Sequence, residues 1–294
     1  MDKSRAIGAH GGKTMKSNGA VLWQGASLLD GAPIVVIATG LANKSSNAKT
    51  GAMIQTYILR ADMEPHLAVR LGADVSICGQ CPHRGTVRSP LEPGQVSSAW
   101  ADGPHEKRTC YVNIGQGPLG VYRAWKRGVY IDVKVAAAET GLAYGLALRD
   151  IGRGRQVRLG TYGDPAAVPA DVWAALVSRA AGHTGYTHQW RLCDPALRTL
   201  CMASADSVAD AAEAQRAGWR TFRVAQPCDP GKTRQLAEVV CPASAEAGKK
   251  LTCSQCMACG GADGRRGNIV INAHGGFAVM THINSRGVRP YFAR

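Results

Sequence analysis

Short apolar runs that end in glycine or polar residues recur along the chain, and segments with helix start and stop signals lie between them. In the first half, these runs predict strands over 33–40 and 53–60, with a polar loop between them. Acidic or proline starts and glycine ends predict helices over 64–72 and 118–128. Residues 131–155 fit no single element, although their second half has helical character.

From residue 156 onward the alternation becomes regular. It predicts strands over 156–163, 184–190, 199–205, 220–225, 237–243 and 268–275, and helices over 169–182 and 206–219. Asp206 or Ser207 caps the last of these helices, and Gly218 closes it. Strands alternating with helices indicate βα units and a parallel sheet. We therefore expect an α/β fold of parallel β/α units, either an open sheet or a complete or partial β/α (TIM-like) barrel.

The chain composition predicts one folded unit behind a short arm. Residues 1–20 are rich in glycine, serine, lysine and alanine without periodicity, which predicts a flexible basic arm. Residues 21–294 are then a single β/α domain, long enough to bury one substantial core. Two cysteine-rich loops, 73–112 and 241–260, are expected to bind a metal or cluster. A loop as long as the first one usually carries function.

Polar residues follow most of the predicted strands of the second half. The segments are Tyr162-Gly163-Asp164-Pro165, His188-Gln189-Trp190, Ser204-Ala205-Asp206, Cys241-Pro242 and His274-Gly275. Functional sites of parallel β/α folds lie at the carboxyl ends of the strands, so these residues are candidates for one site. Structural roles are the alternative. Asp164 and His274 could be turn residues, His188 could be a core histidine, and Asp206 could be a helix cap.

Seven of the ten cysteines fall into two sets that differ in number. The three-cysteine set is Cys78, Cys81 and Cys110, and the four-cysteine set is Cys241, Cys253, Cys256 and Cys259. Cysteines at C-x2-C spacing point both sulfurs the same way, so they can bind one metal ion or one iron–sulfur cluster. Four thiolates fill the coordination of zinc or a cluster, whereas three leave a position where metal chemistry can occur. We therefore expect one closed site and one open site.

Disulfides are the alternative for a chain with this many cysteines. The first 20 residues lack the apolar segment of a secretory signal, and no run approaches 18 apolar residues. We therefore expect a cytoplasmic protein without membrane contact, in which thiols stay reduced and clustered cysteines bind metal. Cys193, Cys201 and Cys228 stand alone, and a lone cysteine is usually a small buried hydrophobic residue.

The formal net charge is +14, and Arg149, Arg153, Arg155 and Arg158 are among the residues that contribute to it. An excess of this size favours a polyanionic partner, of which nucleic acid is the commonest. A generally basic solvated surface explains the charge equally well, because no nucleic-acid-binding motif accompanies it.

Several motifs in this order resemble radical SAM iron–sulfur proteins. They are C-G-Q-C-P (78–82), T-C-Y-V (109–112), the strand end G-T-Y-G-D-P (160–165) and the downstream four-cysteine set. The likeness is closest to uncharacterised phage and prophage proteins related to that superfamily. It covers roughly residues 76–112 and 157–275. The chain lacks the superfamily's usual C-x3-C-x2-C motif, because residues 82–109 separate Cys81 from the third cysteine.

The resemblance implies roles for particular residues. Cys78, Cys81 and Cys110 would hold a [4Fe–4S] cluster whose free iron binds S-adenosylmethionine (SAM). Tyr111 would stack near that ligand, Gly163 and Asp164 would meet its amino group, and Ser204 joins them as a cofactor-binding residue. Cys241, Cys253, Cys256 and Cys259 would hold an auxiliary cluster. His188, Asp164 and His274 are the candidate catalytic residues, acting as acid–base groups at the strand ends.

Two functions follow from these observations. The first is a radical SAM-like enzyme that receives electrons from a donor protein and acts on a nucleotide or a nucleic acid. The second is a zinc-stabilised, non-catalytic nucleic-acid-binding protein. In that case the four-cysteine set is a structural zinc site, and His83 or His105 completes the three-cysteine set as a fourth ligand.

Overall fold

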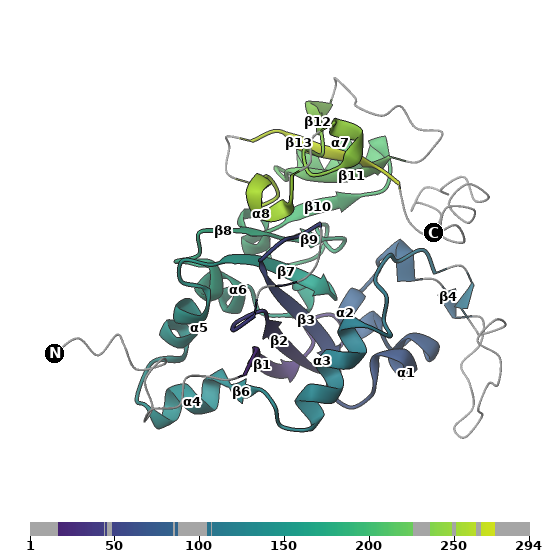
Figure 1. Cartoon of the computed structure of the whole chain (residues 1–294). Coiled ribbons are helices and arrows are strands. Elements are labelled where there is room, and N and C mark those ends of the chain that lie inside the picture. Colours follow the sequence, from purple (N-terminus) through teal and green to yellow (C-terminus); the bar gives the residue numbers. More distant parts are fainter. Residues whose placement is uncertain are drawn as a thin grey trace.

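The strands of the protein form two larger sheets and one short pairing (Figure 1). The computed structural model describes residues 17–43, 45, 49–84, 86–87, 105–106, 108–225, 236–248, 251–262 and 266–273. The short pairing joins β4 (Thr86–Val87) to β5 (His105–Glu106). No helix in the described ranges is long and apolar enough to cross a membrane.

The first large sheet has six strands in the order β6-β1-β2-β3-β7-β8. These strands are β1 (Gly19–Ala26), β2 (Pro33–Thr39), β3 (Ile54–Arg60), β6 (Ile131–Asp132), β7 (Gln156–Tyr162) and β8 (Gly182–Thr184). Strand β2 is antiparallel to both of its neighbours, β1 and β3, whereas the pairs β1–β6, β3–β7 and β7–β8 are parallel. The sheet therefore changes from antiparallel to parallel at β3.

The second sheet has five parallel strands in the order β12-β13-β11-β10-β9. They are β9 (Tyr186–Thr187), β10 (Met202–Ala205), β11 (Thr221–Ala225), β12 (Glu238–Val240) and β13 (Asn268–Asn272). Only Gly185 separates β8 of the first sheet from β9 of the second. A Cβ there would lie 2.7 Å from the sulfur of Cys201, so the chain needs glycine where it passes between the sheets.

Helices flank the first sheet on both sides (Figure 1). The described helices are α1 (Pro65–Arg70), α2 (Val75–Cys78), α3 (Gly117–Lys126), α4 (Val133–Glu139), α5 (Tyr144–Gly152), α6 (Ala170–Val177), α7 (Val208–Arg216) and α8 (Cys253–Cys256). Helix α7 packs against β10 and β11 of the second sheet. Helices α4, α5 and α6 lie along one side of the first sheet, and α1 and α3 lie along the other. Short 3-10 turns cover Pro82–Arg84, Pro165–Ala167, Pro195–Thr199 and Ala245–Ala247.

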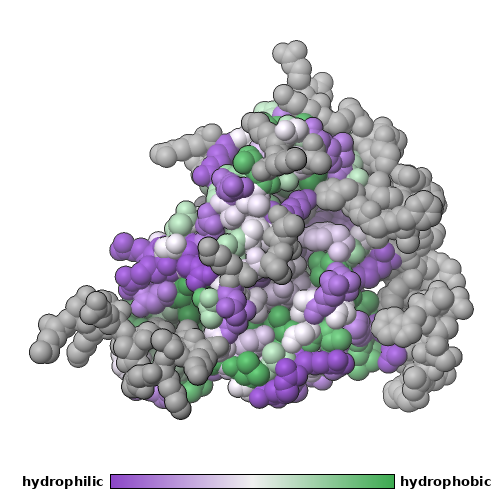
Figure 2. All heavy atoms as spheres, viewed as in Figure 1, coloured by the Kyte–Doolittle hydropathy of each residue, from purple (hydrophilic) through white to green (hydrophobic). Residues whose placement is uncertain are grey.

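The largest core lies between the first sheet and α5 and α6. It contains fully buried side chains from β2, β3 and β7, such as Val35, Leu59 and Leu159. Trp173 of α6 is fully buried in it and donates its ring N–H to the carbonyl of Pro165 at 2.9 Å. Figure 2 shows hydrophilic residues gathered on the outer side of this region, over α5 and α6. Because hydrophilic residues cover their outer side, these helices have the amphipathic character of a layer that covers a sheet.

The expected α/β class with parallel strands is confirmed, and most predicted elements occur within a few residues of their expected positions. The strand predicted over 184–190 is wrong as a single strand, because Gly185 divides it and its second part ends at Thr187. The ambiguous region 131–155 contains β6, α4 and α5. The first 16 residues of the predicted arm and His274 lie outside the described residues.

Candidate active site

One cavity of about 610 Å³ contains both cysteine sets on its walls. It is lined by Cys78, Cys81, Cys110, Cys241, Cys253, Cys256 and Cys259, together with Tyr111, Tyr162, Gly163, Asp164, His188, Ser204 and Asp206. Four of the five polar strand ends therefore meet at the same place. The volume lies within the range of about 300–1,000 Å³ that is usual for small-molecule sites.

The C-x2-C turn of the three-cysteine set begins at the end of α2 and is held by Gln189. The amide nitrogen of this side chain donates to the carbonyl of Cys78 at 3.2 Å, and its oxygen accepts from the Gln80 N–H at 3.1 Å. Gly79 has φ +56°, and a Cβ there would lie 2.4 Å from the Gln189 side chain. Glycine is therefore required at this turn for both its conformation and its close contact.

The third cysteine reaches this turn through backbone hydrogen bonds to the carbonyl of His83. The N–H groups of Thr109 and Cys110 donate to it at 3.2 and 3.0 Å. Nearby, the buried Asp74 carboxylate forms ion pairs with Arg84 at 2.7 Å and Arg108 at 3.3 Å. These contacts bring Cys110 to Cys78 and Cys81 despite the long separation in sequence.

The end of β7 is tied directly to the cysteine turn. The N–H of Asp164 donates to the carbonyl of Ile77, one residue before Cys78, at 2.6 Å. Gly163 has φ +86°, and a Cβ there would lie 2.6 Å from the Cβ of Ile58. The Gly-Asp pair therefore positions the turn by close backbone approach.

The Asp164 carboxylate starts the 3-10 turn that follows it and also holds the end of β9. One oxygen accepts from the Ala166 N–H at 3.0 Å, and the other accepts from the His188 N–H at 2.8 Å. Burial raises the pKa of Asp164 above its usual value, against the lowering effect of these hydrogen bonds. The turn role that the sequence left open is thus present, together with a contact that positions His188.

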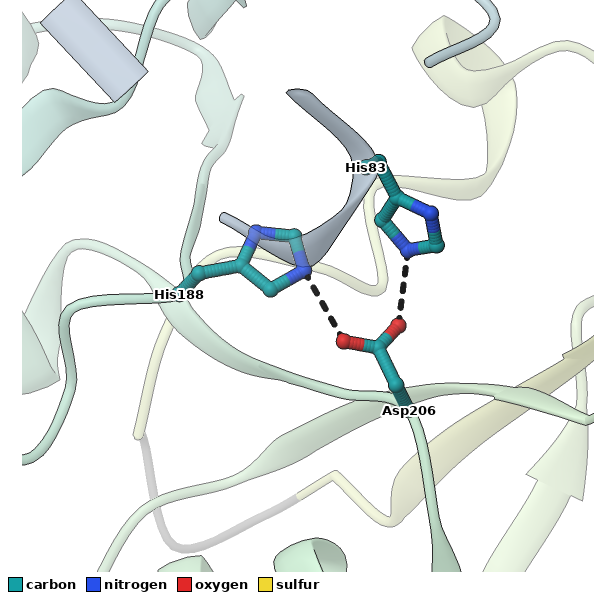
Figure 3. A group of neighbouring side chains, drawn as sticks. All are labelled: His83, His188 and Asp206. Carbon is teal, nitrogen blue, oxygen red and sulfur yellow. Dashed lines mark hydrogen bonds and ion pairs between the residues drawn. The ribbon is translucent and has the colours of Figure 1, made fainter. Parts of the chain in front are cut away.

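Asp206 bridges two histidines at the cavity wall (Figure 3). One carboxylate oxygen lies 2.8 Å from His83 Nε2, and the other lies 3.4 Å from His188 Nε2. The Nδ1 of His83 lies 2.8 Å from the Thr109 hydroxyl. Ser207, not Asp206, caps α7 by accepting from the Asp210 N–H. The cap role therefore does not account for the Asp206 side chain.

Of these two histidines, His188 also contacts the three-cysteine set, through Cys81. Burial raises the pKa of the Cys81 thiol, but the charge and hydrogen bond of His188 outweigh burial, so the pKa is lowered. Burial lowers the pKa of His188, but the charges of Cys81 and Asp206 raise it well above its usual value. At Cys78, burial and the charge of Asp74 raise the thiol pKa well above its usual value. Cys81 is therefore the thiol of this pair that most readily becomes a thiolate.

The four-cysteine set is anchored to both sheets. Its second and third members lie on α8, and the Cys253 N–H donates to the carbonyl of Lys49 at 2.8 Å in the loop before β3. The Cys241 N–H donates to the carbonyl of Val270 at 2.8 Å, and the Cys259 carbonyl accepts from the Gly185 N–H at 3.1 Å. Three cysteines from separate segments are thereby brought to one wall of the cavity.

Arg220 fixes the loop that follows α8. Its guanidinium donates to the carbonyls of Ala258, Gly261 and Gly267 at 2.9, 2.8 and 2.6 Å. Because Arg220 is buried, these bonds compensate the removal of its charge from water. The loop that carries Cys259 is thus held by one buried side chain.

The donor sets fit soft metals, because seven thiols face one cavity and each is free of disulfide bonds. Among the residues that the structure describes, the group with three ligand atoms mutually within 4.8 Å is His83, His188 and Asp206, and neither cysteine set forms such a group. Four sulfurs around one zinc ion stand about 3.8 Å apart, given Zn–S bonds of about 2.3 Å. The sulfurs here are therefore spread more widely than one zinc ion holds them.

A hydroxyl beside the three-cysteine set is also consistent with a bound group. The buried hydroxyl of Tyr162 has no hydrogen-bond partner within the described ranges. Burial, followed by the charge of Cys78, raises the pKa of Tyr162 well above its usual value, and Cys110 contributes in the same direction. A buried hydroxyl is costly without an acceptor, and cluster or thiolate sulfur is an acceptor that this position could contact.

Two predicted residues differ from expectation in their surroundings. Arg158, counted in the sequence among the charges of a basic surface, is only 9% exposed and lines the cavity, so it contributes nothing to the outer surface. Tyr111 is 70% exposed, and its hydroxyl accepts from Arg158 at 2.9 Å.

The two histidines that the zinc interpretation offers as a fourth ligand differ in what the structure describes. His83 has both ring nitrogens directed at Thr109 and Asp206 rather than at the thiols, and the His105 side chain is not described.

The sequence placed Gln189 and Asp206 at candidate strand ends but did not predict the contacts that they make, and it counted Arg158 among the surface charges. Position at the carboxyl end of a parallel strand was the available signal for Gln189 and Asp206. Nothing in the sequence distinguished Arg158 from a surface arginine. No model of a known protein family matches the chain, and comparisons with curated proteins and with solved structures gave no match.

Proposed function

We propose that this chain is an iron–sulfur enzyme of the radical SAM type that acts on a nucleotide or a nucleic acid in a reducing compartment such as the cytoplasm. The observation that carries the proposal is the shared cavity, which both cysteine sets and four polar strand ends line. A structural metal site does not need to open onto a cavity of this size, whereas an enzyme needs its metal beside its substrate.

The spacing of the thiols supports clusters over zinc. The cysteine sulfurs stand farther apart than a single zinc ion would hold them. This spacing suits a cluster, in which each iron takes one thiolate. The alternative, a zinc-stabilised non-catalytic protein, uses His83 or His105 as the fourth ligand of the three-cysteine set, and of these two side chains the structure describes that of His83. Both ring nitrogens of His83 lie 2.8 Å from hydrogen-bonding partners, the Thr109 hydroxyl and the Asp206 carboxylate, so this side chain already has partners other than a metal.

In the proposed enzyme, Cys78, Cys81 and Cys110 hold the [4Fe–4S] cluster that binds SAM, and the four-cysteine set holds an auxiliary cluster. When bound there, such a cluster would supply the one-electron reduction by which radical SAM enzymes cleave SAM and start hydrogen abstraction from a substrate. Gln189 fixes the C-x2-C turn and His188 hydrogen-bonds the Cys81 sulfur. Hydrogen bonds to cluster sulfurs tune the reduction potential, so His188 acts as a tuning group in this proposal.

The SAM amino group is proposed to meet Gly163 and Asp164 at the end of β7, with Tyr111 and Ser204 on the surrounding wall. Gly163 and Asp164 line the cavity next to the cysteine turn, which supports this placement. Each Asp164 oxygen accepts a backbone hydrogen bond, and a carboxylate has further lone pairs for an ammonium group. Asp164 and His188 remain the proposed catalytic residues within the described chain.

We also propose that the parallel strands form a partial β/α barrel around the cavity. The order β3-β7-β8, then β9-β10-β11, follows the sequence, and each bonded pair of neighbours is parallel. At the edge the order is reversed, because β13 lies between β11 and β12. Only Gly185 lies between β8 and β9, which supports one continuous curved array. Sequential parallel order with a site at the carboxyl ends is the arrangement that such barrels use.

Anaerobic purification followed by iron, sulfide and zinc quantification tests the proposal. Two clusters predict about eight irons and eight sulfides per chain. The Cys81→Ala and Cys256→Ala variants should each lose about four irons, and Cys193→Ala, which removes a thiol outside both sets, should lose none. Zinc without sulfide in the wild-type chain would contradict the proposal and support the zinc-stabilised alternative.

A further inference from the structure

Three polar side chains form a row across neighbouring parallel strands of the first sheet. The register pairs Gln55 of β3 with Arg158 of β7, and Arg158 with Thr184 of β8. Residues paired in register on adjacent strands point to the same face of a sheet. All three line the cavity, so the row faces the same space as the cysteines.

Arg158 is a buried cation without a carboxylate partner. It is 9% exposed, and no acid forms an ion pair with it among the residues that the structure describes. Its contacts are a 2.9 Å hydrogen bond to the Tyr111 hydroxyl and the ring of Tyr186, whose centroid lies 5.4 Å from the guanidinium carbon. A guanidinium taken out of water with neutral partners only is costly, and an anion in the cavity would compensate that cost.

A second, independent observation lies beside it. The Thr184 side chain is 1% exposed, and no described group hydrogen-bonds its hydroxyl. A buried hydroxyl without a partner usually marks a position where a bound molecule or water belongs. Thr184 and Arg158 are direct cross-strand neighbours, so one ligand group could contact both.

The wall contributed by the second sheet has a different character. Tyr186 and Phe222 pack with ring centroids 4.7 Å apart, and Val224 and Ile271 continue this wall as apolar lining. Flat unsaturated rings bind well against such surfaces. The cavity therefore combines a cationic, hydroxyl-bearing wall with an aromatic and apolar wall.

We propose that Arg158, Thr184 and Tyr111 form a phosphate-binding subsite for a nucleotide, with its base against the Tyr186–Phe222 wall. The inference rests on the proposed function and narrows its substrate to one that places a single phosphorylated nucleotide inside the cavity. Arginine matches the geometry of a phosphate with two parallel hydrogen bonds, and the hydroxyls of Thr184 and Tyr111 supply further donors.

A different role for Arg158 competes with this one. Burial raises the pKa of the Cys253 thiol above its usual value and the charge of Arg158 opposes this effect, so the arginine could serve as counter-charge to the four-cysteine set. That role does not involve the Thr184 hydroxyl. Thr184 therefore separates the two roles.

The test is the affinity of the full-length chain for nucleoside 5′-monophosphates and for the matching nucleosides, measured by calorimetry. We expect the monophosphates to bind more tightly than the nucleosides. The Thr184→Val variant should bind monophosphates on the order of 10-fold more weakly, and Arg158→Lys on the order of 10- to 100-fold more weakly, without change for nucleosides. Thr184→Val removes a hydroxyl that the described fold does not use, so it should fold even if Arg158→Lys does not. Arg123→Met, at an exposed arginine, is the control for general charge.

The outcomes separate this inference from the proposed function. Equal affinity of the wild type for nucleosides and monophosphates, or wild-type affinity in Thr184→Val, would overturn the phosphate subsite. Loss of iron from Arg158→Lys with unchanged nucleotide affinity would assign the arginine to the four-cysteine set instead. Loss of SAM affinity alone would assign it to the cofactor and also overturn the inference. Iron and sulfide content, measured on the same samples, reports on the proposed function independently.

Discussion

The C-x2-C turn is held at the residue scale by a side chain that comes from more than 100 positions later in the chain. Gln189 satisfies one donor and one acceptor of the turn, and Gly79 has no side chain where the amide of Gln189 packs. The spacing of Cys78 and Cys81 was enough to predict that they lie together. The clamp by Gln189 was not predictable, because it depends on where β9 ends relative to α2.

Truncation of this clamp should loosen the turn. We expect Gln189→Ala to reduce the free energy of unfolding by about 1–3 kcal/mol, because two backbone groups lose their partners. It should also reduce the iron retained after reconstitution. The control is Gln24→Ala, since Gln24 makes only an exposed hydrogen bond to Asp132. Urea unfolding of both variants measures the difference, and equal effects would show that Gln189 does not support the turn.

The junction between β7 and the cysteine turn is decided at the scale of elements. The end of β7, the end of α2 and the end of β9 meet at Asp164, whose N–H donates to the carbonyl of Ile77 and whose carboxylate accepts from the His188 N–H. Periodicity predicted these elements well, because strand and helix patterns are local. Periodicity did not predict the division of 184–190 into two strands. The need for glycine at position 185 comes from its contacts with Leu200 and Cys201, which a local pattern does not report.

Gly163→Ala tests this junction against a matched glycine. Both Gly163 and Gly31 have positive φ, +86° and +79°, but a Cβ at Gly31 meets nothing within 4 Å. Gly31→Ala should therefore cost about 1 kcal/mol from backbone strain alone. Gly163→Ala should reduce the free energy of unfolding by about 1–3 kcal/mol more than Gly31→Ala does, because its added Cβ would overlap Ile58. Thermal and urea unfolding provide the comparison, and equal costs would refute the close approach at Gly163.

At the scale of the whole molecule, the two large sheets are joined by one extended segment, in which only Gly185 separates β8 from β9. The sequence predicted the α/β class and the parallel strands, because alternation of strands and helices is visible without contacts. The antiparallel start of the first sheet and the wall of the cavity depend on long-range pairing, which no local pattern reports. Arg158 illustrates the limit, since its charge looked like surface charge until the fold placed it inside.

The net charge of +14 leads to a prediction about the outer surface. The full-length chain should bind mixed-sequence DNA or RNA with an affinity that falls steeply between about 50 and 200 mM salt, because binding releases counterions. Arg158→Gln should leave this binding unchanged although it removes a positive charge, since Arg158 lies in the cavity. Filter binding or fluorescence anisotropy across a salt series measures the slope. No binding at low salt would remove nucleic acid polymers from the proposed substrates.

We propose that the three-cysteine set holds a cluster with an open iron, and the rest of the proposed function depends on this cluster. The most direct measurement is the EPR spectrum of the reconstituted, reduced chain with and without SAM. We expect SAM to change the cluster signal, because it would bind the free iron without displacing a protein ligand. Cys110→Ala should abolish the change, and His83→Ala should leave it intact. A spectrum that SAM does not alter would contradict this proposal, and loss of one bound zinc in His83→Ala or in His105→Ala would support the zinc-stabilised alternative instead.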